Sequence, residues 1–230
     1  MAWQKVGHRG APREFPGNTL RSFQAAVARG CTMVECDVRQ ARDGVLVLAH
    51  DPEVKPEQGP EVAVAEQTSR DLYALDLGAG EGVPTLDEMV AWAQGRCAVM
   101  ADMKCGGGGV EAQVVEALSA LPPEAKLVPG AAAESRRRFR EIDPALPLSL
   151  SLGIEQASTL DTDDWEELLA GMVAVTWEYP LLDARRIARL HALGRRVYAW
   201  TVDDVETMRR LIAAGVDGII SNRADLMQSL

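Results

Sequence analysis

Residues 173–221 read VAVTWEYPLLDARRIARLHALGRRVYAWTVDDVETMRRLIAAGVDGIIS. Three apolar runs in this stretch, 173–176, 196–201 and 218–221, predict short strands. Between them, apolar side chains repeat at helical spacing, and the helical segments end at Gly194 and Gly215, as helices commonly do. Strands that alternate with helices in this way are typical of a parallel sheet built from βαβ units.

The same alternation extends upstream through the rest of the chain. Further strands are expected at 5–7, 32–38, 96–103, 126–128 and 146–150, with an extension at 45–48. Helices are expected near 19–29, from Thr85 onward, and near 109–121, 132–142 and 163–170. Eight strand–helix units in 230 residues is the count of an α/β protein with a (β/α)8 TIM barrel. We therefore expect residues 1–230 to form a single barrel domain, with a short excursion around 52–82.

A doubly wound open sheet is the alternative fold. That fold binds dinucleotides through a Gly-x-Gly-x-x-Gly turn after its first strand, and no such turn follows a strand here. The glycine run Gly106–Gly109 lacks the Lys-Ser/Thr of a phosphate-binding P-loop, so it indicates a flexible loop.

Composition excludes several classes of function. The formal net charge is -10 and the pI is about 4.9, which argues against nucleic acid as a partner. No apolar stretch approaches membrane-spanning length, and the first residues lack the apolar core of a signal peptide. We expect a cytoplasmic protein without stable membrane insertion, whose four cysteines are buried, reduced thiols. The sequence leaves the oligomeric state open.

Acidic side chains lie near the ends of two expected strands. Glu35 and Asp37 are two residues apart, so both point to one face of their strand while Cys36 points to the other. Asp102 and Lys104 repeat this spacing on the next strand. Because inward-facing carboxylates repel each other without a partner, this pattern predicts a bound cation. An all-oxygen ligand set favours Mg²⁺ or Ca²⁺ over Zn²⁺, and Lys104 could contact a substrate's non-bridging oxygens.

Two of the three histidines follow strands in the same region. His8 is succeeded by Arg9 after the first strand, and His50 comes after the 45–48 extension. A histidine pair can supply a general acid and a general base, and an arginine can bind a phosphate. These are the components of a metal-assisted phosphodiesterase. The third histidine, His191, lies in an expected helix among arginines, and we assign it no role.

The ordered motifs resemble those of the glycerophosphodiester phosphodiesterase family. They are His8-Arg9-Gly10-Ala11, Pro16-Gly17-Asn18-Thr19, Glu35-Cys36-Asp37, His50-Asp51, Asp102-Met103-Lys104, Ala199-Trp200-Thr201-Val202-Asp203 and Gly215-Val216-Asp217-Gly218. The resemblance runs from residue 7 to about 225. It implies cleavage of a small-molecule glycerophosphodiester to sn-glycerol 3-phosphate and an alcohol, with one divalent cation.

The resemblance also implies roles for individual residues. Glu35, Asp37 and Asp102 would hold the metal, His8 and His50 would be the acid–base pair, and Arg9 and Lys104 would bind the phosphate. Trp200 would form an apolar wall for the glycerol, or it is simply part of the barrel core. Whether water attacks phosphorus directly, or a substrate hydroxyl first forms a cyclic phosphate, stays open.

Two departures from the family pattern affect the expected substrate. Gly17 stands where the family has Glu, and Asp102 stands where a longer Glu is usual. Related barrel phospholipases such as sphingomyelinase D are similar in using Asp at that point. A lysophospholipase D or sphingomyelinase D-like activity is therefore one alternative. It predicts an apolar approach to the site, which Leu181 and Leu182 could supply unless they pack beneath the next helix. The other alternative is a weakened, non-catalytic barrel that only binds phosphodiesters.

Overall fold

The computed structural model describes residues 3–160 and 164–230. In these residues, eight parallel strands form the sheet at the centre of the molecule. They are β1 (Gln4–Gly7), β2 (Met33–Gln40), β6 (Ala98–Met103), β7 (Lys126–Leu127), β8 (Ser149–Leu152), β9 (Ala174–Glu178), β10 (Arg196–Trp200) and β11 (Gly218–Ser221). Their order is β7-β6-β2-β1-β11-β10-β9-β8, and a parallel bridge between Val128 and Leu148 joins the two outermost strands. The sheet is thus a nearly closed barrel, and the predicted (β/α)8 fold is confirmed.

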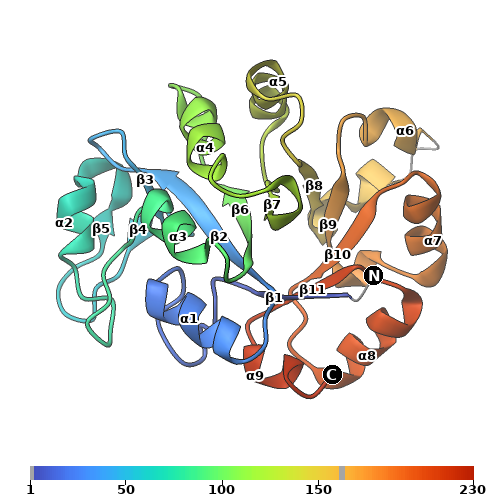
Figure 1. Ribbon diagram of the computed structural model, residues 1–230, viewed down its shortest axis with the longest axis horizontal. Coiled ribbons are helices and arrows are strands. Elements are labelled where there is room, and N and C mark those ends of the chain that lie inside the picture. The colour runs from blue at the N-terminus through green and yellow to red at the C-terminus, as the bar shows by residue number, and fades with distance from the viewer. Residues whose placement is uncertain (1–2, 161–163) are drawn as a thin grey trace.

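Helices surround the strands as a ring, and the colours of Figure 1 follow the chain around it. The helices are α1 (Leu20–Ala28), α3 (Leu86–Ala93), α4 (Val110–Leu118), α5 (Ala133–Ile142), α6 (Trp165–Leu168), α7 (Ala184–Ala192), α8 (Val205–Ala214) and α9 (Ala224–Met227). Short 3₁₀ turns add η2 (Pro123–Ala125), η3 (Ile154–Leu160) and η4 (Tyr179–Leu181). The helix expected around 163–170 corresponds to α6, and residue 163, where it was expected to begin, lies outside the described residues.

Local sequence signals explain where these helices begin and end. Thr85 and Glu88 form the capping box that starts α3: the Thr85 side chain accepts from the Glu88 backbone, and the Glu88 side chain accepts from the Thr85 backbone. Asp183 and Asp204 cap α7 and α8 in the simpler way, each accepting one backbone N–H of the first turn. Gly215 ends α8 with a φ of +97°, a left-handed conformation that favours glycine.

Two-residue alternation along the strands produces two separate apolar layers. One face of β2 carries Val34, Cys36 and Val38, which pack in the large core between the sheet and the helices. The other face carries Met33, which packs inside the barrel with the side chains of facing strands. That interior cluster consists of Val6, Met33, Ala98, Met100, Leu127, Ala174, Tyr198 and Ile220. Glu35 and Asp37 share the face of Met33, so they continue the barrel interior toward the carboxyl ends of the strands.

The excursion around 52–82 has more order than its polar sequence indicates. β3 (Leu46–Leu48) pairs antiparallel with β2, and the chain then forms a small hairpin of β4 (Glu53–Val54) and β5 (Val62–Ala63). The turn η1 (Val64–Glu66) and helix α2 (Ser69–Tyr73) follow. Figure 1 shows this group at the left, outside the ring of helices. It has its own small apolar cluster, which includes Val64, Leu72 and Val83.

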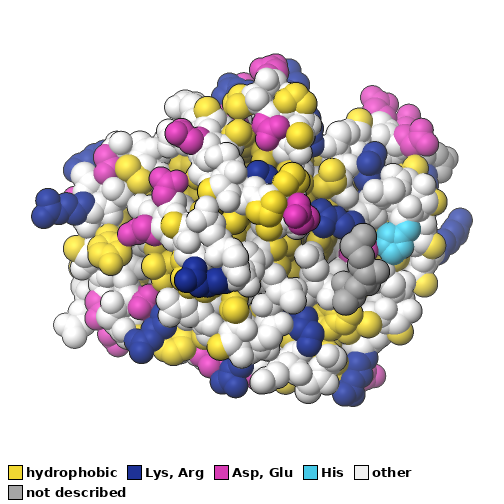
Figure 2. Space-filling view, viewed as in Figure 1, with side chains coloured by type: hydrophobic (Ala, Val, Ile, Leu, Met, Phe, Trp, Pro, Cys, Tyr) yellow, Lys and Arg dark blue, Asp and Glu magenta, His cyan; other side chains and the backbone are white. Residues whose placement is uncertain are grey.

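The charged side chains on the face shown in Figure 2 form no basic stripe. Figure 2 shows Lys and Arg side chains dispersed among Asp and Glu on that face. Cys31 and Cys36 are buried, Cys97 and Cys105 are partly exposed, and all four are free thiols. Across the described residues, no helix is both long and apolar enough to span a bilayer.

Candidate active site

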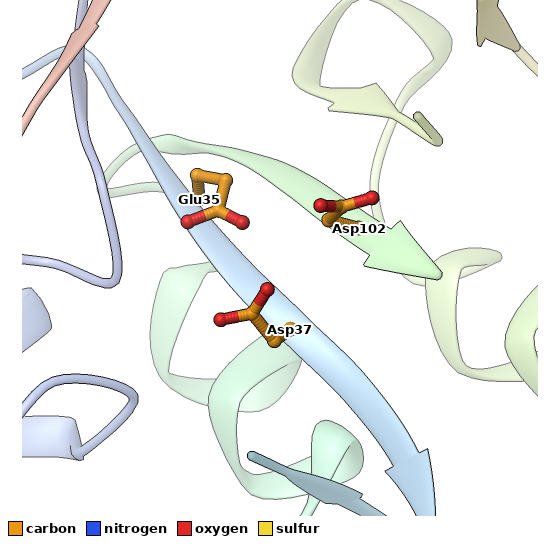
Figure 3. Close-up of side chains that lie close together, drawn as sticks. All are labelled: Glu35, Asp37 and Asp102. Atoms are coloured by element: carbon orange, nitrogen blue, oxygen red, sulfur yellow. The ribbon is translucent and has the colours of Figure 1, made fainter. Parts of the chain in front are cut away.

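Three carboxylates meet at the carboxyl end of the barrel. Asp37 on β2 and Asp102 on β6 are register partners in adjacent parallel strands, and Glu35 lies one inward-facing position before Asp37. One oxygen from each carboxylate lies within 4.8 Å of the other two. Figure 3 shows the three side chains pointing toward one another from β2 and β6. The convergence predicted from the sequence is therefore present.

Basic side chains partly neutralise these carboxylates. Arg9 Nε lies 3.1 Å from Asp37 Oδ2, and Lys104 Nζ lies 3.2 Å from Asp37 Oδ1. Lys104 also forms a 2.7 Å ion pair with Asp102 Oδ2. Glu35 Oε2 accepts a 2.8 Å hydrogen bond from the Arg9 backbone N–H. Three carboxyl groups thus face two side-chain cations, which leaves one carboxyl group of this cluster without a cationic partner.

Two of the carboxyl groups have raised pKa values in this arrangement. Burial raises the pKa of Glu35 well above its usual value, and the neighbouring charge of Asp37 raises it further. Burial also raises the pKa of Asp102, although Lys104 acts in the opposite direction. Asp102 Oδ1 is buried with no hydrogen-bond partner among the described residues. The carboxyl group without a cationic partner, the unpartnered oxygen and the all-oxygen donors together fit a hard divalent cation.

Gly130 limits the space around Asp102. A Cβ on Gly130 would lie 1.8 Å from Asp102 Oδ1, and Gly130 has a φ of +72°. Any side chain here would therefore displace the Asp102 carboxylate. The backbone conformation independently favours glycine.

His8 is oriented by a chain of hydrogen bonds from the opposite side. Its Nδ1 lies 2.7 Å from Asn222 Oδ1, and Asn222 Nδ2 donates to Asp203 Oδ2 at 2.8 Å. Because the Asn222 amide donates to the carboxylate, its oxygen must accept, which assigns the His8 proton to Nδ1. The unprotonated Nε2 then lies on the Glu35 side, 3.9 Å from Glu35 Oε2. Burial, assisted by Arg9, lowers the pKa of His8 from 6.5 to about 4, so its ring is neutral near pH 7.

His50 occupies a more exposed position after β3. Its Nδ1 lies 2.9 Å from Asp51 Oδ1, and its backbone carbonyl accepts two hydrogen bonds from the Arg39 guanidinium. The side chain is 39% exposed, in contrast to 18% for His8. The two histidines therefore differ in environment: His8 is partly buried and neutral, and His50 is more accessible to solvent beside a carboxylate.

A single cavity of about 630 Å³ brings most of the predicted site residues together. Its lining includes His8, Arg9, Glu35, His50, Asp102, Lys104 and Trp200. Asp37 lies just behind this surface and is 1% exposed. The Trp200 indole is fixed by a 2.8 Å hydrogen bond from its Nε1 to the Thr176 carbonyl. His191 lies elsewhere, on α7, paired with Asp217 at 2.8 Å.

Other residues near the site were not singled out from the sequence. Asn18 hydrogen-bonds Asp37 twice: its Nδ2 donates to Asp37 Oδ2, and its Oδ1 accepts the Asp37 backbone N–H. Asn18 and Asp203 both lie within quoted motifs, so position in a motif was the available signal. Asn222 carried no comparable signal, since it is recognisable only as the residue after the last strand.

Leu181 and Leu182 do not provide an apolar approach to the cavity. They are 5% and 3% exposed and pack in the core between the sheet and the helices. The alternative in which they simply pack beneath the next helix is therefore the correct one. The apolar approach that a lipid substrate predicts is absent at these two positions.

Comparison with known proteins identifies the family. The model of the glycerophosphoryl diester phosphodiesterase family matches residues 8–106 and 128–226. The chain belongs to this family. It is similar to the probable glycerophosphodiester phosphodiesterase 2 of Mycobacterium tuberculosis, with 32% identity over 98% of this chain and 89% of that protein. The predicted family and enzyme class are thus confirmed.

Solved structures show the same fold. A glycerophosphodiester phosphodiesterase from Agrobacterium tumefaciens superposes with a TM-score of 0.82 at 24% identity, covering the whole of both chains. An Oleispira antarctica phosphodiesterase has a TM-score of 0.86 at 23% identity, covering 98% of this chain and 95% of that one. That structure is a complex with the product sn-glycerol-3-phosphate.

Proposed function

We propose that this protein hydrolyses small-molecule glycerophosphodiesters to sn-glycerol 3-phosphate and an alcohol with the aid of one divalent cation. The observation that carries the proposal is the meeting of three carboxylates, two cationic side chains and two histidines at one cavity. Family membership and the product bound to the Oleispira antarctica relative support the same reaction.

Glu35, Asp37 and Asp102 would hold the cation. Their carboxylate oxygens suit Mg²⁺ or Ca²⁺, both of which prefer oxygen ligands. When bound, the cation would offset charge that develops on the phosphoryl oxygens. Asn18 would keep Asp37 in its ligating orientation through the two hydrogen bonds between them.

Arg9 and Lys104 would bind the non-bridging phosphate oxygens. Both lie at the cavity wall beside the carboxylates, and both retain donors that their ion pairs do not use. Because their charges lie next to the cation site, they would stabilise the same phosphoryl group from adjacent directions. Trp200 would supply an apolar surface for the organic part of the substrate.

The environments of the histidines suggest a division of labour. His8 is neutral with a free Nε2, so it would accept the proton of the attacking oxygen. His50 would donate a proton to the departing alcohol oxygen as the bond between phosphorus and that oxygen breaks. A water molecule supplies the oxygen that remains on the product phosphate, whether it attacks first or opens a cyclic intermediate.

The test is release of sn-glycerol 3-phosphate from glycerophosphocholine by the purified protein, with and without EDTA. We expect EDTA to abolish turnover and Mg²⁺ or Ca²⁺ to restore it. His8→Ala and His50→Ala should each lower kcat by about 100-fold or more. His191→Ala is the matched control, since His191 lies outside the cavity, and it should keep wild-type activity. Metal-independent turnover, or none with several alcohol groups, would contradict the proposal.

A further inference from the structure

One wall of the cavity carries an acidic side chain, Glu178, that the proposed chemistry does not use. Glu178 at the end of β9 and Trp200 at the end of β10 are register partners in adjacent parallel strands. Both line the cavity, as does Glu155, which follows β8. This wall comes from β8, β9 and β10, whereas the carboxylate cluster comes from β2 and β6.

The acidic charges on this wall are uncompensated. Among the described residues, no Lys or Arg forms an ion pair with Glu178 or Glu155. Glu178 Oε2 accepts a 2.6 Å hydrogen bond from the Ile154 backbone N–H, which orients the carboxylate without neutralising it. Asp37 and Asp102, in contrast, both contact Lys104. The cavity is therefore divided into a side with cations for a phosphate and a side with free negative charge.

Gly153 lies close to these groups. A Cβ on Gly153 would lie 3.5 Å from both Glu178 Oε2 and Trp200 Cη2, and 3.2 Å from Gln156 Oε1. Gly153 does not have the positive φ that would itself favour glycine. An added side chain would therefore crowd the Gln156 carboxamide and contact both the Glu178 carboxylate and the Trp200 indole.

We propose that Glu178 and Trp200 bind a positively charged alcohol group, so that the preferred substrates are zwitterionic glycerophosphodiesters. This inference rests on the proposed function and specifies its substrate class. An ammonium group next to Glu178 would gain a charge partner, and its methyl or methylene groups would contact the indole of Trp200. Glu155, more exposed, adds negative charge at the rim. With the phosphate near Arg9 and Lys104, such a substrate is oriented at both ends.

The experiment compares kcat/KM for glycerophosphocholine, whose alcohol is cationic, with that for glycerophosphoglycerol, whose alcohol is neutral. The key variant is Glu178→Gln, which removes the charge and keeps an oxygen that can accept from Ile154. We expect wild type to prefer the cationic substrate. We expect the variant to lose about tenfold of that preference, equivalent to about 1.4 kcal/mol.

Two further variants sharpen the comparison. Glu141→Gln, on the exposed surface of α5, changes the net charge equally and should leave the substrate ratio unchanged. Gly153→Ala would narrow the space beside Glu178 and should raise KM for glycerophosphocholine more than for glycerophosphoglycerol.

The outcomes separate this inference from the proposed function. If wild type hydrolyses both substrates without preference, or Glu178→Gln affects both equally, the charged subsite is wrong and the phosphodiesterase proposal stands. Equal loss would instead indicate that Glu178 binds a hydroxyl of the glycerol group that the two substrates share. If wild type hydrolyses neither substrate with metal present, both proposals fail.

Discussion

His8 Nδ1 and Asn222 Oδ1 lie 2.7 Å apart, joining the partly buried histidine to the residue that follows the last barrel strand. Asn222 is itself fixed by Asp203, which accepts hydrogen bonds from both its side chain and its backbone N–H. This relationship ties the first and last strands of the barrel together at the site. It also determines which ring nitrogen of His8 faces the cavity.

The first prediction concerns this orientation. Asn222→Ala removes the acceptor of the His8 Nδ1–H, so the ring can rotate or change tautomer. We expect kcat to fall by about 10- to 100-fold, as is usual when a residue that orients a functional side chain is lost. KM should change much less, since Asn222 does not line the cavity. Steady-state kinetics with glycerophosphocholine measures both values, and a change in KM alone would contradict a positioning role.

A second prediction follows from the lowered pKa of His8. In the metal-free protein, neutral His8 contributes fully to folding stability above pH 6.5. This contribution is lost as pH falls through about 4, because the unfolded state binds the proton more readily than the folded state does. As pH falls from 6.5 to about 4, the free energy of unfolding should decrease by up to about 3 kcal/mol more for wild type than for His8→Gln, whose side chain does not titrate. Urea unfolding in EDTA across this range measures the difference, and parallel curves for the two proteins would refute it.

The third prediction concerns proton release on metal binding. Because the pKa of Glu35 is raised in the metal-free protein, its contribution to stability is present at low pH and is lost as pH rises through that raised value. A cation requires the ionised carboxylate, so metal affinity should increase with pH, and binding should release protons. Calorimetric titration in two buffers of different ionisation enthalpy detects these protons.

A matched variant tests whether the protons come from Glu35. Glu35→Gln cannot lose a proton at this position, so its metal binding should be weaker and the difference in heat between the two buffers should be smaller than for wild type. If wild type gave equal heats, Glu35 would already be ionised and its raised pKa would be wrong.

The sequence was most informative where a periodic pattern determines which way the side chains of a strand or helix point. The two-residue spacing of Glu35 and Asp37 determined that both face inward, and the strand–helix alternation determined the barrel. The nearness of Asp102 to Asp37 depends on the register of β2 and β6, which follows from the whole barrel rather than from either strand.

Other features depend on geometry that the sequence does not express. Asn18 reaches Asp37 from a loop position with a φ of +61°. Glu178 lies two residues beyond the strand expected at 173–176, so it was not considered for the site. The β4–β5 hairpin was missed because its two-residue strands are too short for an alternating pattern to appear.

The last prediction uses two glycines with nearly equal φ angles and different surroundings. Gly130 has a φ of +72° and Gly80 has a φ of +74°. Alanine at either position should cost about 1 kcal/mol through left-handed backbone strain. At Gly80 nothing lies within 4 Å of the added Cβ, whereas at Gly130 the Cβ would lie 1.8 Å from Asp102 Oδ1. Gly130→Ala must therefore move the Asp102 carboxylate, and Gly80→Ala should leave it in place.

We expect Gly80→Ala to lower thermal stability slightly while retaining wild-type metal affinity and kcat. Gly130→Ala should weaken metal binding by about 10-fold or more, because displacement of one carboxylate removes a ligand from the group of three. Calorimetric metal titration and steady-state kinetics on the two folded variants make the comparison. If Gly130→Ala and Gly80→Ala bound the cation equally well, Asp102 would not be a ligand, and the cation site would have to rest on Glu35 and Asp37 alone.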